Sequence, residues 1–160
     1  MAGDTATAED MLRDEAEPTF TADYLGYLLA RASFLVNEGA HAHARAAGLS
    51  VMEWRVLATL WGRDRIGVGE LAQIVLERQP TLTKALDRMA EKGLVRREGS
   101  ETDRRVVLVS MTETGRASIG PVLARTRALE RRLLDGYAPD EELRLKSMLK
   151  ELIERLGGEA

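Results

Sequence analysis

Apolar residues recur at three- and four-residue spacing from residue 23 onward. Leu25, Leu28, Leu29, Ala32, Leu35 and Val36 fall on one stripe, which predicts an amphipathic helix that ends near Gly48. Ser50 and Glu53 then form a capping-box pattern that predicts the start of a second helix. Its buried face would consist of Met52, Val56, Leu57 and Leu60, with Leu49 packed against Trp54.

Two further helices are predicted before the period changes. The third spans about residues 68–75, and the fourth carries Pro80 in its first turn and ends at Gly93. The fourth helix would bury Leu82, Leu86 and Met89. Residues 94–97 and 106–109 are short β-rich runs around a polar, glycine-containing loop, which predicts a hairpin.

Two long helices are predicted in the last part of the chain. Thr112 caps the fifth helix and Pro139 opens the sixth. The predicted fold is therefore mostly α with a small β-hairpin wing: a winged helix-turn-helix at 50–112, flanked by helices at 21–48 and 113–157 within a single domain of residues 21–160. The flanking helices have apolar stripes with few residues to cover them, so we expect them to pair with a second subunit in a homodimer.

The fourth helix has a polar face that suits a nucleic acid. Burying its leucines leaves five polar side chains outward: Gln79, Thr81, Thr83, Lys84 and Arg88. An α-helix fits the major groove of DNA, where Gln79 could pair with adenine, the threonines could contact phosphates or a thymine methyl group, and the cations could neutralise phosphates. The alternative is an ordinary solvated helix surface.

The predicted hairpin concentrates arginine. Asp103-Arg104-Arg105 leads into its second strand, and Arg96 and Arg97 lie on the opposite strand. An arginine at the tip of such a wing can enter the minor groove of DNA, and Asp103 could orient it through charge-assisted hydrogen bonds. The alternative, a surface ion pair, accounts less well for four arginines on one hairpin.

These motifs together resemble a known family. Residues 79–95 (QPTLTKALDRMAEKGLV) resemble the recognition helix of MarR-type (multiple antibiotic resistance regulator) transcriptional regulators. Asp103-Arg104-Arg105, continuing through Leu108 to Thr112-Glu113-Thr114-Gly115, is similar to that family's most specific signature, and Trp54-Arg55-Val56-Leu57 also resembles it. The likeness covers about residues 23–157.

The resemblance implies a homodimer that reads a pseudo-palindromic operator in double-stranded DNA. It places Arg105 in or near the minor groove, with Arg104 beside it and Asp103 as the wing-orienting partner. It also implies repression that is released when a small molecule, commonly an aromatic acid or its derivative, is bound. The chain departs from the family pattern at Arg78, where a small capping residue is usual, and at residues 76–77, where no glycine marks the turn. Arg78 is therefore expected to face a phosphate.

The composition of the chain excludes several classes of function. The 160 residues contain no cysteine and two histidines, which excludes thiol chemistry. His41 and His43 would point about 200° apart on a helix and could not share a metal. The sequence shows no serine–histidine–aspartate set with plausible spacing, no glycine-rich phosphate loop and no metal-ligand cluster, so we expect no enzyme activity and no cofactor. No apolar run reaches the roughly 20 residues of a membrane span, and no secretory signal opens the chain, so we expect a cytoplasmic protein without a membrane partner.

The charge is divided unevenly along the chain. Residues 1–30 hold seven acidic residues against Arg13, a charge of −6, whereas the whole chain carries −3. Residues 1–20 are acidic and aperiodic, and we interpret them as a flexible tail. Net charge therefore neither supports nor excludes a DNA partner.

Aromatic and basic side chains on the first two helices suggest an effector site. Tyr27 and Arg31 on the first helix, with Trp54 and Arg55 on the second, could form a cleft for a planar carboxylate. The alternative is that the aromatics belong to the core and the arginines are ion-paired. Two other functions stay open: constitutive DNA binding without an effector, and a winged-helix adaptor that uses the same polar helix to bind a partner protein.

Overall fold

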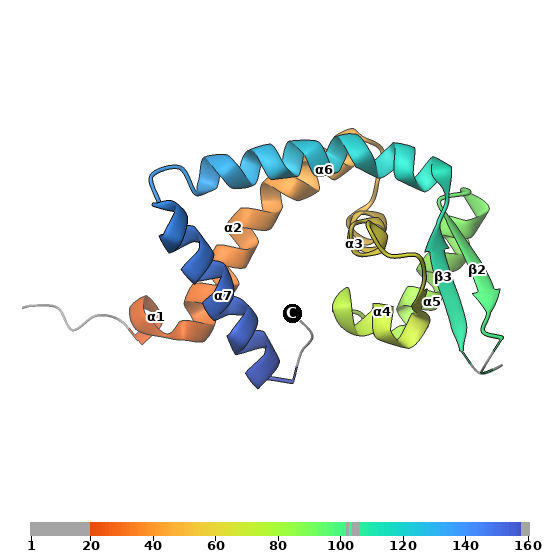
Figure 1. Cartoon of the computed structure of the whole chain (residues 1–160), viewed down its shortest axis with the longest axis horizontal. Helices are drawn as coiled ribbons and strands as arrows, with labels where there is room; N and C mark the ends of the chain where they lie inside the picture. Colours follow the sequence, from red (N-terminus) through yellow and green to blue (C-terminus); the bar gives the residue numbers. More distant parts are fainter. Residues whose placement is uncertain (1–19, 102, 104–105, 158–160) are drawn as a thin grey trace, which may run out of the picture. The chain divides into compact units, whose positions relative to one another are not determined.

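The computed structural model describes residues 20–101, 103 and 106–157 (Figure 1). The chain divides into two compact units, Met1–Val36 and Asn37–Ala160. The first unit holds α1 (Phe20–Asp23) and the beginning of α2 (Leu25–Ala46), which continues into the second unit. The predicted helix start at residue 23 is replaced by a break at Tyr24, whose ring stacks on Phe20 with centroids 4.9 Å apart.

The middle of the chain has the predicted winged helix-turn-helix order. It contains α3 (Val51–Leu60), β1 (Ile66–Gly67), α4 (Val68–Ile74), α5 (Gln79–Glu91), β2 (Val95–Gly99) and β3 (Val107–Met111). The hairpin of β2 and β3 confirms the sequence prediction. The two-residue strand β1 was not predicted; it pairs antiparallel with β3 and gives the sheet order β1-β3-β2.

Local sequence signals explain where these helices begin. At α3 the Ser50 hydroxyl accepts a hydrogen bond from the Glu53 backbone N–H at 3.2 Å, and the Glu53 carboxylate accepts one from the Ser50 N–H at 2.7 Å. The predicted capping box is therefore confirmed. Pro80 lies in the first turn of α5, where a missing N–H leaves no helical hydrogen bond unmade.

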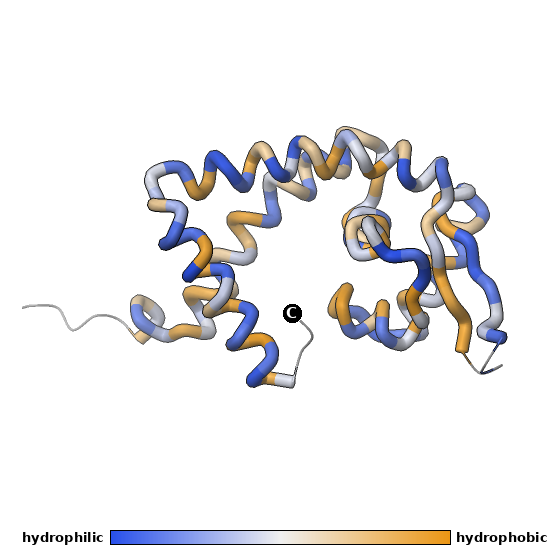
Figure 2. The backbone as a smooth tube through the Cα atoms, viewed as in Figure 1, coloured by the Kyte–Doolittle hydropathy of each residue, from blue (hydrophilic) through white to orange (hydrophobic). Residues whose placement is uncertain are grey.

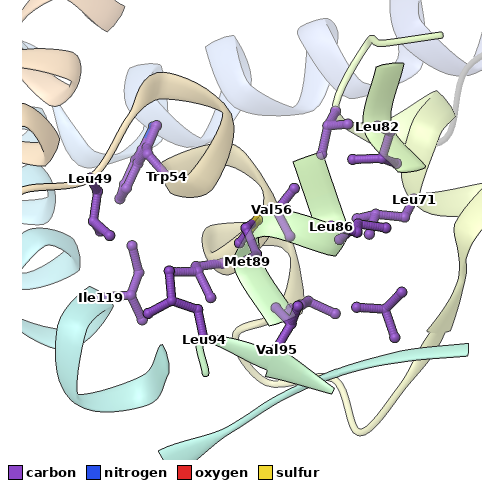
Figure 3. Close-up of a cluster of buried hydrophobic side chains, with 14 of the residues drawn as sticks. Leu49, Trp54, Val56, Leu71, Leu82, Leu86, Met89, Leu94, Val95 and Ile119 are labelled. Carbon is purple, nitrogen blue, oxygen red and sulfur yellow. The ribbon is translucent and has the colours of Figure 1, made fainter. Parts of the chain in front are cut away.

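One apolar core holds the three helices against the sheet. Leu57, Leu71, Leu82 and Leu86 are completely buried, and Met89 is 1% exposed. Figure 3 shows Leu71, Leu82, Leu86 and Met89 in one cluster with Trp54, Val95 and Ile119 from neighbouring elements, and Leu57 belongs to the same core. Burying a leucine stabilises a fold by about 1.5–3 kcal/mol, so this core fixes which side of α5 faces inward.

Two long helices complete the second unit. Thr112 caps α6 (Glu113–Leu133) by accepting a hydrogen bond from the Gly115 N–H at 3.0 Å, as predicted. In α7 (Pro139–Arg155), Lys146 contacts Glu130 of α6 at 2.9 Å. Hydrophobic and hydrophilic positions alternate along α7 (Figure 2). Several of its apolar side chains remain exposed, namely Leu143, Leu145, Met148, Leu149 and Ile153. Among the described residues, no helix combines the length and apolar character needed to cross a lipid bilayer.

Candidate nucleic-acid interface

Helix α5 presents a polar face opposite its buried one. Gln79, Thr81, Lys84 and Arg88 are all exposed, whereas the three apolar residues of the helix predicted to face inward are buried. Thr83 is half-buried, and its hydroxyl donates to the Gln79 carbonyl oxygen at 2.9 Å. A threonine hydroxyl in a helix can bond in this way to the carbonyl group one turn earlier.

The turn before α5 has an unusual backbone. Leu76 has a positive φ of 56° and its side chain is 85% exposed. The next residues confirm the departure seen in the sequence: Arg78 is the N-cap and makes no side-chain capping bond. Instead the Arg78 backbone N–H donates to Oε1 of Glu77 at 2.9 Å, and Arg78 is exposed at the start of α5.

An ion pair ties α5 to the hairpin. The Arg97 guanidinium on β2 donates from one terminal nitrogen to Asp87 on the outer side of α5. Its Nε is buried and has no hydrogen-bond partner among the residues that the structure describes. Arg96 pairs with Glu98 along the same strand at 3.7 Å. Two of the four hairpin arginines thus engage acids of the protein itself.

The tip of the hairpin is only partly described. The Asp103 backbone N–H donates to the Ser100 hydroxyl at 3.3 Å, and its carbonyl oxygen accepts from the Val106 N–H at 2.9 Å. Arg104 and Arg105 lie outside the described residues. The roles predicted for Asp103 and these two arginines therefore stay predictions.

A pocket opens between α5 and the hairpin. It has a volume of about 380 Å³ and is lined by Val68, Gly69, Gln79, Thr83, Arg97, Val106 and Val107. The pocket brings a predicted base-reading side chain, Gln79, to the same concave surface as the Arg97 guanidinium. Such a hollow beside a helix and a wing can hold a phosphate group of a nucleic-acid backbone.

The buried carboxylate of Glu53 connects helix α3 to the end of helix α5. Glu53 is 6% exposed, and its Oε1 accepts a hydrogen bond from Lys92 at 2.7 Å. Burial raises the pKa of Glu53, but the hydrogen bonds from Lys92 and Ser50 outweigh it and hold the pKa below its ordinary value. Because Lys92 is the C-cap of α5, the carboxylate links the start of α3 to the end of the polar helix.

The four residues predicted to line an effector cleft differ in burial and in hydrogen bonding, and they belong to different units of the chain. In the first unit, Arg31 donates to the Tyr27 hydroxyl at 3.3 Å. In the second unit, Trp54 is 9% exposed and belongs to the apolar core, as the alternative interpretation expected of the aromatics, while Arg55 is exposed. Burial, together with the positive charges of Arg55 and Arg45, lowers the pKa of His41.

Sequence reasoning did not include the pair of Asp87 and Arg97 among the site residues. The two lie ten positions apart on a helix and a strand, so no helical or strand period relates them. The signal that was available is an exposed acid between two cations on α5, Lys84 and Arg88, followed by a strand with two consecutive arginines.

Several known proteins are similar to this chain in sequence and in fold. The family model of the MarR family matches residues 49–107. The chain is 31% identical over 134 residues to the HTH-type transcriptional repressor IacR of Pseudomonas putida, covering 84% of this chain and 80% of that protein. It superposes on a MarR family transcriptional regulator from Silicibacter pomeroyi DSS-3 with a TM-score of 0.75 and 40% identity, over 86% of this chain and 98% of that one.

A third relative was solved as a complex. The transcriptional repressor CouR, bound to a 23-mer DNA duplex, matches with a TM-score of 0.72 and 27% identity, over 86% of this chain and 98% of that one. CouR is also known from Rhodococcus jostii RHA1. The identity to these regulators extends over most of their length, and the shared region includes α5 and the hairpin. The chain therefore belongs to the MarR family of transcriptional regulators.

Proposed function

We propose that this regulator binds double-stranded DNA as a homodimer, with α5 in the major groove and the hairpin tip at the minor groove, and that it represses transcription until a small ligand binds. The observation that carries the proposal is the two-sided character of α5. Its apolar side is locked in the core, so Gln79, Thr81, Lys84 and Arg88 can only face away from the protein.

Each polar group on α5 has a role that fits DNA. An exposed glutamine near a helix N-terminus can pair with adenine in the major groove, which suits Gln79. Lys84 and Arg88 carry charges suited to phosphates, and Arg78 lies just before the helix with its guanidinium exposed. Thr81 can contact a phosphate or a thymine methyl group, whereas Thr83 contributes mainly to the wall of the pocket beside the hairpin.

Exposed apolar side chains support the homodimer. Along α7 they recur on a helical spacing, as at Leu145, Met148 and Leu149. Monomeric soluble proteins seldom leave such continuous apolar surface to water. In a two-fold dimer the same surface on a second copy would cover it, and two copies of α5 about 34 Å apart would meet successive major grooves.

Release by a ligand completes the proposal. A ligand can shift the spacing of the two copies of α5 only by its difference in affinity for the two arrangements. A small aromatic acid or a derivative of one is the proposed effector. In the first unit, Tyr27 and Arg31 are candidates to contact it, and in the second unit Arg55 is a separate candidate. The burial of Trp54 favours a role in the core for that side chain.

The test is fluorescence anisotropy with labelled DNA from the region upstream of the protein's own coding sequence. Binding should saturate and survive an excess of unlabelled random DNA. Lys84→Gln should weaken binding and reduce the magnitude of the log–log salt slope by about 1.8, because each of the two copies loses one phosphate contact and each contact contributes about 0.9. Lys150→Gln makes an equal change of charge on α7 and should leave the affinity and the salt slope unchanged.

The hairpin tip is tested in the same assay. Arg105→Ala should weaken binding to the specific duplex while the dimer, measured by light scattering, persists. Unchanged affinity of this variant would refute the role of the wing. If the wild-type protein bound no DNA even at low salt, the α5 face would instead serve a protein partner, as in an adaptor.

A further inference from the structure

Leu76 is the most exposed large apolar residue in the part of the chain that the structure describes. It is 85% exposed, compared with 78% for Leu156 and 77% for Phe20. Most other exposed apolar residues lie in the helices that flank the winged helix-turn-helix, or at the ends of those helices. Leu76 instead lies in the turn between α4 and α5 and is not part of the apolar core. The homodimer contact proposed along α7 therefore does not account for it.

The backbone at Leu76 is strained as well. Its φ of 56° lies in the left-handed region, which a residue with a β-carbon adopts only at a cost in free energy. The turn has a structural purpose, because the Glu77 N–H donates to the Ala72 carbonyl oxygen at 2.9 Å and so ends α4. A glycine would serve that purpose without strain. Glycine stands at the other left-handed positions of the described residues, namely Gly48, Gly62, Gly93, Gly136 and Gly157.

Leu76 adjoins the surface that is proposed to meet DNA. The four residues at the start of α5, Arg78 to Thr81, are all exposed. Two residues of extended chain span at most about 7 Å, so the Cα atom of Leu76 lies within that distance of the Cα atom of Arg78. A duplex that Arg78 contacts therefore passes close to the exposed leucine.

We propose that Leu76 makes an apolar contact with DNA beside the start of α5. The inference rests on the proposed function, in which this end of α5 enters the major groove. Apolar side chains contact thymine methyl groups in that groove, and the CH groups of deoxyribose offer the same chemistry. Strained residues persist mainly where function requires them. The contact explains why an exposed leucine occupies a position where glycine would be more stable.

Fluorescence anisotropy with the labelled upstream duplex tests the contact on two full-length variants. Leu76→Asn removes the apolar side chain but keeps a residue that tolerates the left-handed region. It should weaken specific binding at least about tenfold, because each buried methylene contributes about fourfold and both copies lose the contact. Leu76→Met keeps an apolar side chain of similar volume and should retain most of the affinity.

Two further measurements separate a DNA contact from a structural role. In urea denaturation Leu76→Asn should be at least as stable as the wild type, because the strain is relieved and little contact within the protein is lost. The log–log salt slope should be unchanged, because no phosphate contact is removed.

A duplex with deoxyuridine in place of thymidine identifies the group that Leu76 contacts, because deoxyuridine lacks the methyl group. For a thymine methyl contact, the loss of affinity on this duplex is larger in the wild type than in Leu76→Asn. For a deoxyribose contact, the two proteins lose the same amount.

The inference is wrong if Leu76→Asn binds as tightly as the wild type, if it is less stable, or if Leu76→Met loses as much affinity. A Leu76→Asn protein that is monomeric in light scattering would place the leucine between two copies and would also overturn the DNA contact. A wild-type protein that binds no DNA even at low salt would refute the proposed function as well. Specific wild-type binding that Leu76→Asn retains would refute this inference alone.

Discussion

Replacing Glu53 with glutamine should destabilise the fold by about 1–2 kcal/mol. Each oxygen of this buried carboxylate accepts a hydrogen bond, one from the Ser50 N–H and one from Lys92, both at 2.7 Å. A glutamine can offer its oxygen to only one of these donors and must turn its NH₂ group toward the other. An unmet buried group costs about 1–3 kcal/mol, and we take the lower part of this range because the Lys92 side chain is 58% exposed and regains water.

The pH dependence of the free energy of unfolding is a second, independent test of the role of Glu53. The hydrogen bonds hold the pKa of Glu53 in the folded protein below its ordinary value of 4.5. The unfolded chain therefore takes up this proton first as pH falls, and the stabilisation from Glu53 is fully present above about pH 4.5. It is lost as pH falls through the folded pKa. The stability difference between wild type and Glu53→Gln should accordingly shrink below pH 4.5.

Urea denaturation followed by circular dichroism measures this effect, at one fixed protein concentration because a dimer's stability depends on it. Glu101→Gln, the same substitution at an exposed loop position, should change the free energy of unfolding by less than about 0.5 kcal/mol. Two results would refute the reasoning. One is a Glu53→Gln protein as stable as the wild type at pH 7, and the other is a deficit of equal size at pH 7 and pH 3.

The remaining predictions concern backbone, packing and DNA. Leu76→Gly should raise the free energy of unfolding by about 0.5–1 kcal/mol in urea denaturation, since a left-handed leucine costs about 1–2 kcal/mol and its exposed side chain loses little contact. Gly115→Ala should lower the melting temperature, because the added methyl group would overlap the Leu94 carbonyl oxygen, which cannot rotate away. Asp87→Asn removes a negative charge from α5, so electrostatics alone predicts tighter DNA binding. We expect weaker specific binding by anisotropy, because Arg97 loses the contact that holds the hairpin. Specific DNA binding should weaken linearly on a log–log salt plot, with a slope of about −0.9 per phosphate contacted, and a flat profile would contradict phosphate contacts.

Local features of the fold could be predicted from the sequence, while long-range pairings could not. The capping bonds at Ser50 and Thr112 span only a few residues, so their patterns are legible in the sequence itself. Strand β1 has only two residues and therefore no period. It exists because Ile66 pairs with Val109, more than forty residues away, and β-structure of that kind depends on tertiary context.

The same distinction applies to the candidate site. The buried period of α5 predicts its outward face, and the structure agrees at Gln79, Lys84 and Arg88. Thr83 is less exposed than these residues, and its hydroxyl is bonded to the carbonyl oxygen of the preceding turn, which the period of the helix does not reveal. Trp54 shows a second limit, because spacing alone does not distinguish an aromatic wall of a cleft from a core residue.

The negative net charge of the chain does not oppose DNA binding at α5. The charge summed over the whole chain does not decide the field at one surface, because exposed charges separated by more than about 8–10 Å are largely screened at physiological salt. Of the acids near α5, Glu77 accepts the Arg78 N–H and Asp87 pairs with Arg97. Glu91 is exposed, but it is the last residue of the helix, beyond Lys84 and Arg88. The cations of the helix itself, Lys84 and Arg88, have no acidic partner among the ion pairs of the described residues. A phosphate approaching α5 therefore meets a locally positive surface, and the affinity follows from this local balance and not from the sum over the chain.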